Sequence, residues 1–178
     1  MPIDGRTSKP LHVLFLCTHN SARSQIAEAV MTRKIEQQAF GRFRVGSAGS
    51  APGTQVHPGA LKALASCRID WSGRRPKSID DVCDREWDLI ITVCDRAKET
   101  CPTMPGQPAF AHWGMDDPSE NLDPAAQERA FADVVTQLSR RIDLLLALPV
   151  ETLERRALEV RAQQIAADVP VPRGLTIT

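Results

Sequence analysis

Four short hydrophobic runs predict the strands of a parallel sheet. Residues 12–16 and 87–93 are rich in apolar side chains, and each run ends in a polar segment typical of a turn. Such runs are typical of strands that are covered on both faces. Residues 43–45, which stop at Gly46, and residues 109–112 predict two shorter strands.

Helical spacing of apolar side chains predicts the elements between and after these strands. Residues 24–38 and 58–67 each place apolar side chains on one face, and Pro58 suits the first turn of its helix. The longest pattern covers residues 124–148, where Asp123 is placed to cap the N-terminus. Strands that alternate with helices favour an α/β fold with right-handed crossovers. We therefore expect three layers, α/β/α, around a four-stranded parallel sheet.

The composition of the chain changes after Pro149. Residues 151–167 are rich in charge and predict one more amphipathic helix, whereas residues 169–178 contain prolines and predict a tail of low order. We therefore divide the chain into a main domain, residues 1–149, and a C-terminal helix and tail, residues 150–178. Three roles stay open for this extension: it can cover a site, mediate a dimer or only pack on the main domain.

Composition and charge are those of an ordinary globular protein. Hydrophobic residues make up 42% of the 178 residues and charged residues 25%, and 22 Lys and Arg balance 22 Asp and Glu. The sequence has no basic block to bind nucleic acid and no apolar run long enough to span a membrane. Its N-terminal residues lack a signal-peptide pattern, and its 5 cysteines do not resemble a disulfide framework. We therefore expect a cytoplasmic protein with no nucleic-acid or membrane partner.

One polar segment carries the strongest chemical signal, because it joins the first predicted strand to the first predicted helix. Its sequence is Cys17-Thr18-His19-Asn20-Ser21-Ala22-Arg23-Ser24. A loop that leads into a helix N-terminus points backbone N–H groups at an anion, and ligands of open α/β sheets bind at the carboxyl ends of strands. We expect Cys17 to be a nucleophile whose pKa is lowered by these N–H groups and by the helix dipole.

The other side chains of this segment suit the binding of a tetrahedral oxyanion. Arg23 can offer a planar fork to two oxygens, Ser24 can donate to the thiolate, and Asn20 can brace the loop. We expect the oxyanion to bind between Thr18, His19, Asn20, Ser21, Ala22, Arg23 and Ser24. The alternative is that Cys17 is a buried filler at a strand end and Arg23 a surface residue.

The C-x5-R-S pattern of this loop resembles that of the low molecular weight protein tyrosine phosphatases. The longer segment, residues 17–28, is more similar to the arsenate reductases that share their fold. The resemblance covers residues 12–148 and implies that residues 1–149 form a catalytic domain. It also implies that Asp117, directly before Pro118, is the general acid, with Asp116 as its neighbour. Pro118 favours an extended conformation at Asp117, although an ordinary turn is the alternative for this pair.

The same resemblance implies roles for two further cysteines. Cys94 ends the second buried strand, and Cys101 follows it in a Pro-rich segment. Their spacing resembles the resolving pair of thiol-disulfide coupled arsenate reductases. Two alternatives remain, namely loop thiols without a role and a zinc site formed by Cys94, Cys101 and His112, although this spacing is unlike a C-x2-C site. We expect no bound metal and no tightly bound cofactor.

Two positions in the loop depart from the pattern of the family. Many members carry Gly at the position of His19, which suits a positive φ, although His is among the residues that tolerate one. Ala22 stands where some thioredoxin-linked reductases carry Cys. The electron donor therefore stays open between thioredoxin, glutaredoxin and a small thiol such as glutathione.

Three functions follow from these observations. The first is an arsenate reductase that uses Cys17, Arg23, Asp117, Cys94 and Cys101. The second is a phosphatase that hydrolyses phosphate monoesters through a phosphocysteine, but the chain has no Tyr, and Ser119 and Glu120 follow Pro118 where phosphatases of the fold usually place aromatic residues. The third is a non-catalytic anion sensor or a binding partner of a regulator, which would need neither a nucleophile nor an acid.

Overall fold

A four-stranded parallel sheet is the centre of the fold. The computed structural model describes residues 9–39, 41–95 and 104–171. The sheet has the strand order β2-β1-β3-β4, and each neighbouring pair is parallel. This arrangement confirms the predicted α/β fold. The elements are β1 (Leu11–Cys17), α1 (Arg23–Gln38), β2 (Phe43–Gly49), α2 (Pro58–Ser66), η1 (Ile79–Asp81), β3 (Leu89–Thr92), β4 (Ala109–His112), η2 (Pro118–Glu120), α4 (Pro124–Leu146) and α5 (Arg155–Asp168).

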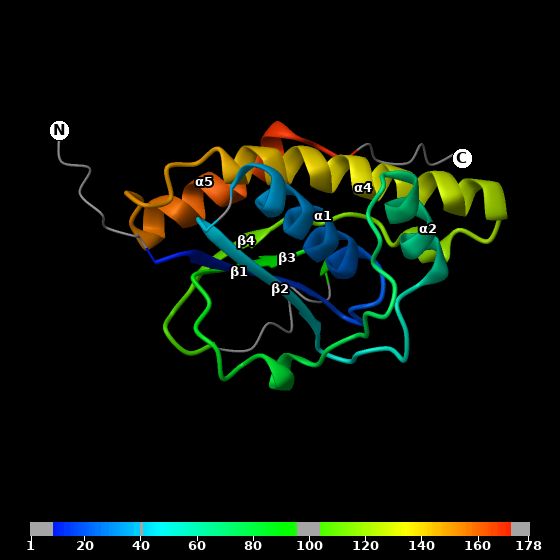
Figure 1. The fold of residues 1–178 in the computed structure, drawn as a ribbon, viewed down its shortest axis with the longest axis horizontal. Helices are drawn as coiled ribbons and strands as arrows, with labels where there is room; N and C mark the ends of the chain where they lie inside the picture. The colour runs from blue at the N-terminus through cyan, green and yellow to red at the C-terminus, as the bar shows by residue number, and fades with distance from the viewer. Residues whose placement is uncertain (1–8, 40, 96–103, 172–178) are drawn as a thin grey trace.

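The central strand β1 is buried because both faces of the sheet are covered. Its residues from Val13 to Cys17 are at most 4% exposed. Figure 1 shows α1 and α4 on one side of the sheet, while the connection that contains η1 passes on the other side. The register pairs Cys17 with Gly49 and Leu16 with Thr92, so three strands end at the same edge. Among the described residues, no helix is long and apolar enough to cross a membrane.

Two predicted boundaries differ from the structure by three residues or more, and each has a local cause. Strand β2 continues past Gly46, where a Cβ would lie 2.7 Å from Cη2 of Trp87. Gly46 therefore makes room for an indole ring and does not end the strand. Helix α5 begins at Arg155 and not at residue 151, because Val150 and Thr152 form turns onto the carbonyls of Leu148 and Pro149.

Helix α5 covers the outer edge of β4. The backbone N–H of Phe110 donates to Glu159 Oε2 at 3.0 Å, and that of His112 donates to Gln163 Oε1 at 2.8 Å. Gln163 Nε2 returns a hydrogen bond to the carbonyl of His112 at 3.3 Å. The amide of Gln163 thus pairs with His112 as a fifth strand would, which protects an otherwise open edge. The boundary between residues 149 and 150 stays a prediction.

Arg141 on α4 anchors α5 to the rest of the fold. The residue is 2% exposed, and its guanidinium donates to the carbonyls of Trp113 at 3.0 Å and Val169 at 2.9 Å. A longer contact of 3.5 Å reaches the carbonyl of Ala166. These acceptors lie after β4 and in the last turn of α5, where a cation is also favoured by the helix dipole. One buried side chain therefore joins three segments.

We expect Arg141→Met to lower the free energy of unfolding by about 2–4 kcal/mol, because it leaves buried carbonyls without their charged donor. The measurement is urea denaturation followed by circular dichroism. The matched control is Arg140→Met, since Arg140 is the exposed neighbour on the same helix, and this variant should stay within about 0.5 kcal/mol of the parent. Equal stability of the two variants would contradict the anchoring role.

Candidate active site

The loop between β1 and α1 is held with its carbonyl groups facing away from its interior. The chain that follows β2 runs beside this loop, and its N–H groups donate hydrogen bonds to four loop carbonyls. These bonds are Ser50 N to Cys17 O at 3.3 Å, Ala51 N to Thr18 O at 2.9 Å, Gly53 N to His19 O at 2.9 Å and His57 N to Ser21 O at 2.7 Å. Loop N–H groups can then face inward, and that of Asn20 points at Cys17 Sγ at 3.1 Å. Such a ring of N–H groups suits an anion.

Gly49, the last residue of β2, allows this close approach. A Cβ at Gly49 would lie 2.5 Å from the carbonyl oxygen of Thr18 and 2.9 Å from the backbone nitrogen of Asn20. Both atoms belong to the backbone of the loop, so a side chain here would displace the loop itself. At the other end of the loop, Ala22 holds the N-cap position of α1 without a side-chain cap. The first N–H groups of the helix are therefore available to a ligand.

Asn20 is the hub of the loop. Its backbone has a φ of 49°, so the left-handed conformation falls on Asn20, and the prediction that placed it at His19 is wrong. The Asn20 amide group donates to Ser24 Oγ at 2.8 Å and to Ser47 Oγ at 2.9 Å. Its oxygen accepts from Gln25 Nε2 at 2.9 Å and from the backbone N–H of Lys77 at 2.8 Å. Both donor hydrogens and both acceptor positions of the amide are used.

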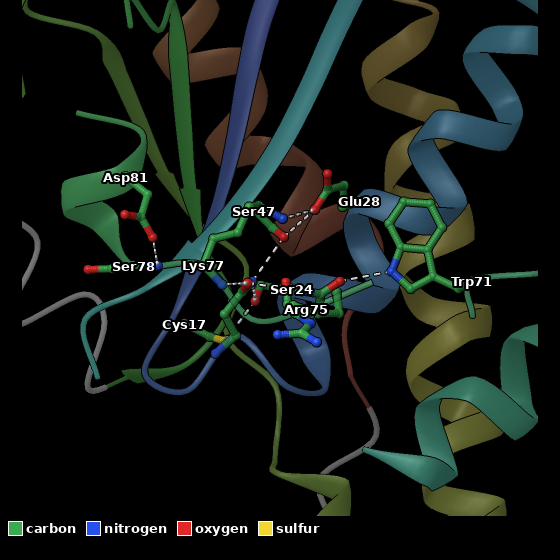
Figure 2. A network of polar contacts seen from close by, with 11 residues as sticks. Cys17, Ser24, Glu28, Ser47, Trp71, Arg75, Lys77, Ser78 and Asp81 are labelled. Carbon is green, nitrogen blue, oxygen red and sulfur yellow. Dashed lines mark hydrogen bonds and ion pairs between the residues drawn. The ribbon is translucent and has the colours of Figure 1, made fainter. Parts of the chain in front are cut away.

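A second set of polar side chains bonds to the partners of Asn20, and Figure 2 shows Ser47, Glu28, Lys77 and Trp71 of this set. Ser47 donates to the Glu28 carboxylate, which also pairs with Lys77 Nζ at 3.1 Å. Trp71 Nε1 donates to Gln25 Oε1 at 2.8 Å. Sequence reasoning missed all of these residues. The available signal was that Gln25 and Glu28, three positions apart, lie among the apolar residues of α1, since polar side chains buried in that way need partners.

Cys17 is deeply buried, which changes its predicted acidity. Burial raises the pKa of the Cys17 thiol, and the nearby Cys94 acts in the same direction. Hydrogen bonds from Ser24, whose Oγ lies 2.8 Å from Cys17 Sγ, and from the Asn20 N–H oppose this rise. The prediction of a lowered pKa is therefore wrong for this state of the protein, because burial outweighs the hydrogen bonds.

Arg23 and Asp117 face one another across the loop. Arg23 Nη2 donates to Asp117 Oδ2 at 3.0 Å, and Nη1 donates to the carbonyl of Met115 at 2.9 Å. Asp117 is extended, with φ −76° and ψ 112°, as Pro118 predicted. Burial alone would raise the pKa of Asp117, but the Ser119 hydroxyl at 2.7 Å and the charge of Arg23 outweigh it and hold that pKa below its usual value.

Cys94 lies beside the same loop, directly after β3. Its Sγ is 3.5 Å from Thr18 Oγ1. A cavity of about 230 Å³ is formed here, and it brings five of the predicted site residues together with acidic neighbours. Its walls are Thr18, His19, Arg23, Cys94, Asp95, Met115, Asp116, Asp117 and Glu120. Cys101, the predicted partner of Cys94, lies outside the described residues.

The described residues gather no metal site, since no three His, Cys, Asp or Glu side chains among them are arranged to hold an ion. The zinc alternative names Cys101, which the structure does not describe. Its His112 has both ring nitrogens engaged, Nδ1 with Thr92 Oγ1 at 2.7 Å and Nε2 with Asp95 Oδ1 at 2.9 Å.

Known proteins with similar sequences and structures agree with this geometry. A sequence model of the family described as low molecular weight phosphotyrosine protein phosphatase matches residues 12–158. Arsenate reductase 1 of Bacillus cereus is 40% identical over 109 residues, which are 60% of this chain and 76% of that protein. A solved arsenate reductase in the phosphate binding state is similar with a TM-score of 0.60 and 27% identity, over 77% of this chain and 97% of that one.

A third relative is the thioredoxin-dependent arsenate reductase of Corynebacterium glutamicum. It is 32% identical, with a TM-score of 0.56 over 76% of this chain and 60% of that one. The family match extends over most of the chain and includes the Cys17 loop, Cys94 and Asp117. This protein therefore belongs to the low molecular weight phosphotyrosine protein phosphatase family.

Proposed function

We propose that the protein is an arsenate reductase, in which Cys17 attacks arsenate and Cys94 then displaces arsenite. The observation that carries this proposal is the cavity in which a second cysteine, Cys94, adjoins Thr18 of the anion loop and shares the walls with Arg23 and Asp117. A phosphatase needs the loop, the arginine and the acid, but it has no use for the second thiol. The arsenate reductases among the similar proteins support the same choice.

The first step forms a bond between sulfur and arsenic. The Cys17 thiolate attacks the arsenic atom of arsenate, while Arg23 and the loop N–H groups bind the remaining oxygens. Asp117 gives its proton to the departing oxygen, which leaves as water. The product is an arsenylated Cys17 in which arsenic is still in the +5 state.

The ion pair between Arg23 and Asp117 links binding to this proton transfer. In the structure the Arg23 charge helps to hold the pKa of Asp117 below its usual value. An oxyanion that draws the Arg23 guanidinium to itself removes part of that stabilisation and adds negative charge nearby. Both changes raise the pKa of the carboxyl group. Substrate binding therefore helps to load Asp117 with the proton that it donates.

The second step is a thiol exchange that reduces arsenic. The Cys94 thiolate attacks Cys17 Sγ, a disulfide forms, and the electron pair of the broken sulfur–arsenic bond stays on arsenic, which leaves as arsenite. Cys101 then attacks Cys94 and frees Cys17. An external thiol donor, thioredoxin, glutaredoxin or a small thiol, reduces the Cys94–Cys101 disulfide to two thiols and is itself oxidised to a disulfide, without any tightly bound cofactor. Such a cycle suits the reducing cytoplasm.

The phosphatase reaction is the second candidate, and the family match favours it. The same loop would bind a phosphate monoester, and water would hydrolyse the phosphocysteine. In this chain Ser119 hydrogen-bonds to Asp117 and Glu120 lines the cavity, so both positions after Pro118 are polar. We therefore expect phosphatase activity to be the weaker one.

The decisive test mixes reduced protein with arsenate in the absence of any reductant. We expect about one arsenite released and about two thiols lost per chain, and Cys94→Ser should abolish the thiol loss and lower arsenite release by at least about tenfold. Cys67→Ser is the matched control, because Cys67 is an exposed thiol on another surface, and it should behave as the parent. Full turnover of Cys94→Ser with thioredoxin as the sole donor would reject the internal exchange. Rapid hydrolysis of an aryl phosphate with no arsenite would favour the phosphatase.

Ser24→Ala should raise the pKa of Cys17 further, because it removes a hydrogen bond that opposes the effect of burial. The rate of Cys17 alkylation by iodoacetamide, followed by mass spectrometry, should therefore reach its half-maximum at a higher pH than in the parent. Ser66→Ala changes a hydroxyl that bonds within α2, and it should leave this titration unchanged. A Cys17 titration that does not move in Ser24→Ala would contradict the stabilising role of the hydroxyl.

Asp117→Asn should slow the single-turnover release of arsenite by about 100-fold, since the amide cannot donate an acidic proton. The adjacent Asp116→Asn removes an exposed carboxylate from the same cavity, and its rate should fall by less than about threefold. Quenched-flow measurement of arsenite compares the two variants. If both slow equally, charge in the cavity and not proton donation accounts for the effect.

A further inference from the structure

The peptide that carries Cys94 is attached to the end of β4 through its neighbour Asp95. Strand β3 ends at Thr92, the N–H of Val93 bonds to the Leu16 carbonyl at 2.9 Å, and Cys94 comes next. The next residue, Asp95, places Oδ1 2.9 Å from His112 Nε2, although its side chain is 90% exposed. An exposed carboxylate is otherwise free to move, so this contact orients the peptide just where it leaves the sheet.

The imidazole of His112 is itself held from several sides. Its Nδ1 lies 2.7 Å from Thr92 Oγ1, and the sheet register pairs these two residues. The backbone of His112 is bonded at both N–H and C=O by Gln163. A Cβ at Gly114 would lie 2.5 Å from His112 Nε2 and 3.1 Å from Asp95 Oδ1, so the glycine leaves room for the contact. The side chain and backbone of His112 are thus both held by hydrogen bonds, on a strand that α5 covers.

The hydrogen bond persists whether or not the imidazole is charged. A carboxylate only accepts, so Nε2 carries a hydrogen and donates to Asp95. In the neutral ring Nδ1 then accepts from the Thr92 hydroxyl, and in the charged ring Nδ1 donates to the same oxygen. The contact therefore connects Asp95 to His112 in either charge state of the imidazole.

We propose that His112 is a positioning residue for thiol exchange: it holds Asp95, and through it the Cys94 peptide, beside Thr18 and the Cys17 loop. The inference rests on the proposed reductase, in which the Cys94 thiolate must meet Cys17 Sγ. Thiol exchange within a protein is fast when the attacking thiolate is kept near the target sulfur, because folding has already met the entropic cost of bringing the two groups together. Here the link runs from α5 through Gln163, His112 and Asp95 to Cys94.

The test uses Asp95→Ala, Asp95→Asn and Asp84→Ala. Asp95→Ala loses the contact, Asp95→Asn keeps an oxygen that accepts from His112, and Asp84→Ala removes an exposed carboxylate elsewhere. We expect Asp95→Ala to slow single-turnover arsenite release by about threefold to fivefold, as the loss of one exposed charged contact allows. Asp95→Asn should recover most of the rate, and Asp84→Ala should match the parent.

A second measurement does not depend on arsenate. Alkylation of reduced protein by iodoacetamide, read for each cysteine by mass spectrometry, should be about threefold to fivefold faster at Cys94 in Asp95→Ala than in Asp95→Asn, while Cys17 is unchanged. Both variants lack the negative charge of Asp95, and only Asp95→Asn keeps the hydrogen bond to His112. A difference between them therefore reports the effect of the hydrogen bond and not that of the charge. Equal Cys94 alkylation in both variants would overturn the positioning role. A parent that releases no arsenite would instead reject the proposed reductase, and a Cys94→Ser variant that keeps full turnover would reject the exchange through Cys94.

Discussion

The site depends on one buried amide, the side chain of Asn20. A loop that turns its N–H groups inward cannot satisfy itself, because its own carbonyls point away and its interior is reserved for an anion. The Asn20 side chain holds the loop in this conformation with four hydrogen bonds. Two of them go to α1, one goes to β2 and one comes from the segment before η1. A fully satisfied buried amide fixes one conformation, whereas a single missing partner would leave a costly polar group.

The polar network that fills the space behind Asn20 joins segments far apart in the sequence. Lys77 takes part twice, since its backbone N–H bonds to Asn20 and its ammonium group pairs with Glu28. Trp71 reaches the same network through Gln25. The loop before η1 is therefore part of the support of the nucleophile, although it carries no reacting group. These contacts hold the loop that begins at Cys17 in one conformation.

Sequence patterns predicted most of the fold because they are local. The period of the apolar residues placed the strands and helices, and Asp123 accepts from the N–H of Ala126 at 2.8 Å as a cap should. The two motifs also placed Arg23 and Asp117 at one cavity, beside the loop that begins at Cys17. What the patterns could not give is non-local: Ser47 and Lys77 match no motif, and their partnership with Asn20 exists only in the folded chain. The direction of the Cys17 pKa shift was missed for the same reason, since burial is a property of the whole fold.

Cys17 and Cys94 lie in different surroundings, and the proposed chemistry requires that difference. Cys17 is enclosed by a loop that bonds through four of its carbonyls to the chain after β2, so its sulfur is held in place while oxyanions arrive. Cys94 follows Val93, whose N–H still bonds to β1, and lies two residues beyond the end of β3. A thiol that must first attack Cys17 and later pass on its disulfide cannot be built into a strand. A side-chain contact such as that of Asp95 with His112 can guide it, because a single exposed hydrogen bond is strong enough to bias the peptide and weak enough to break.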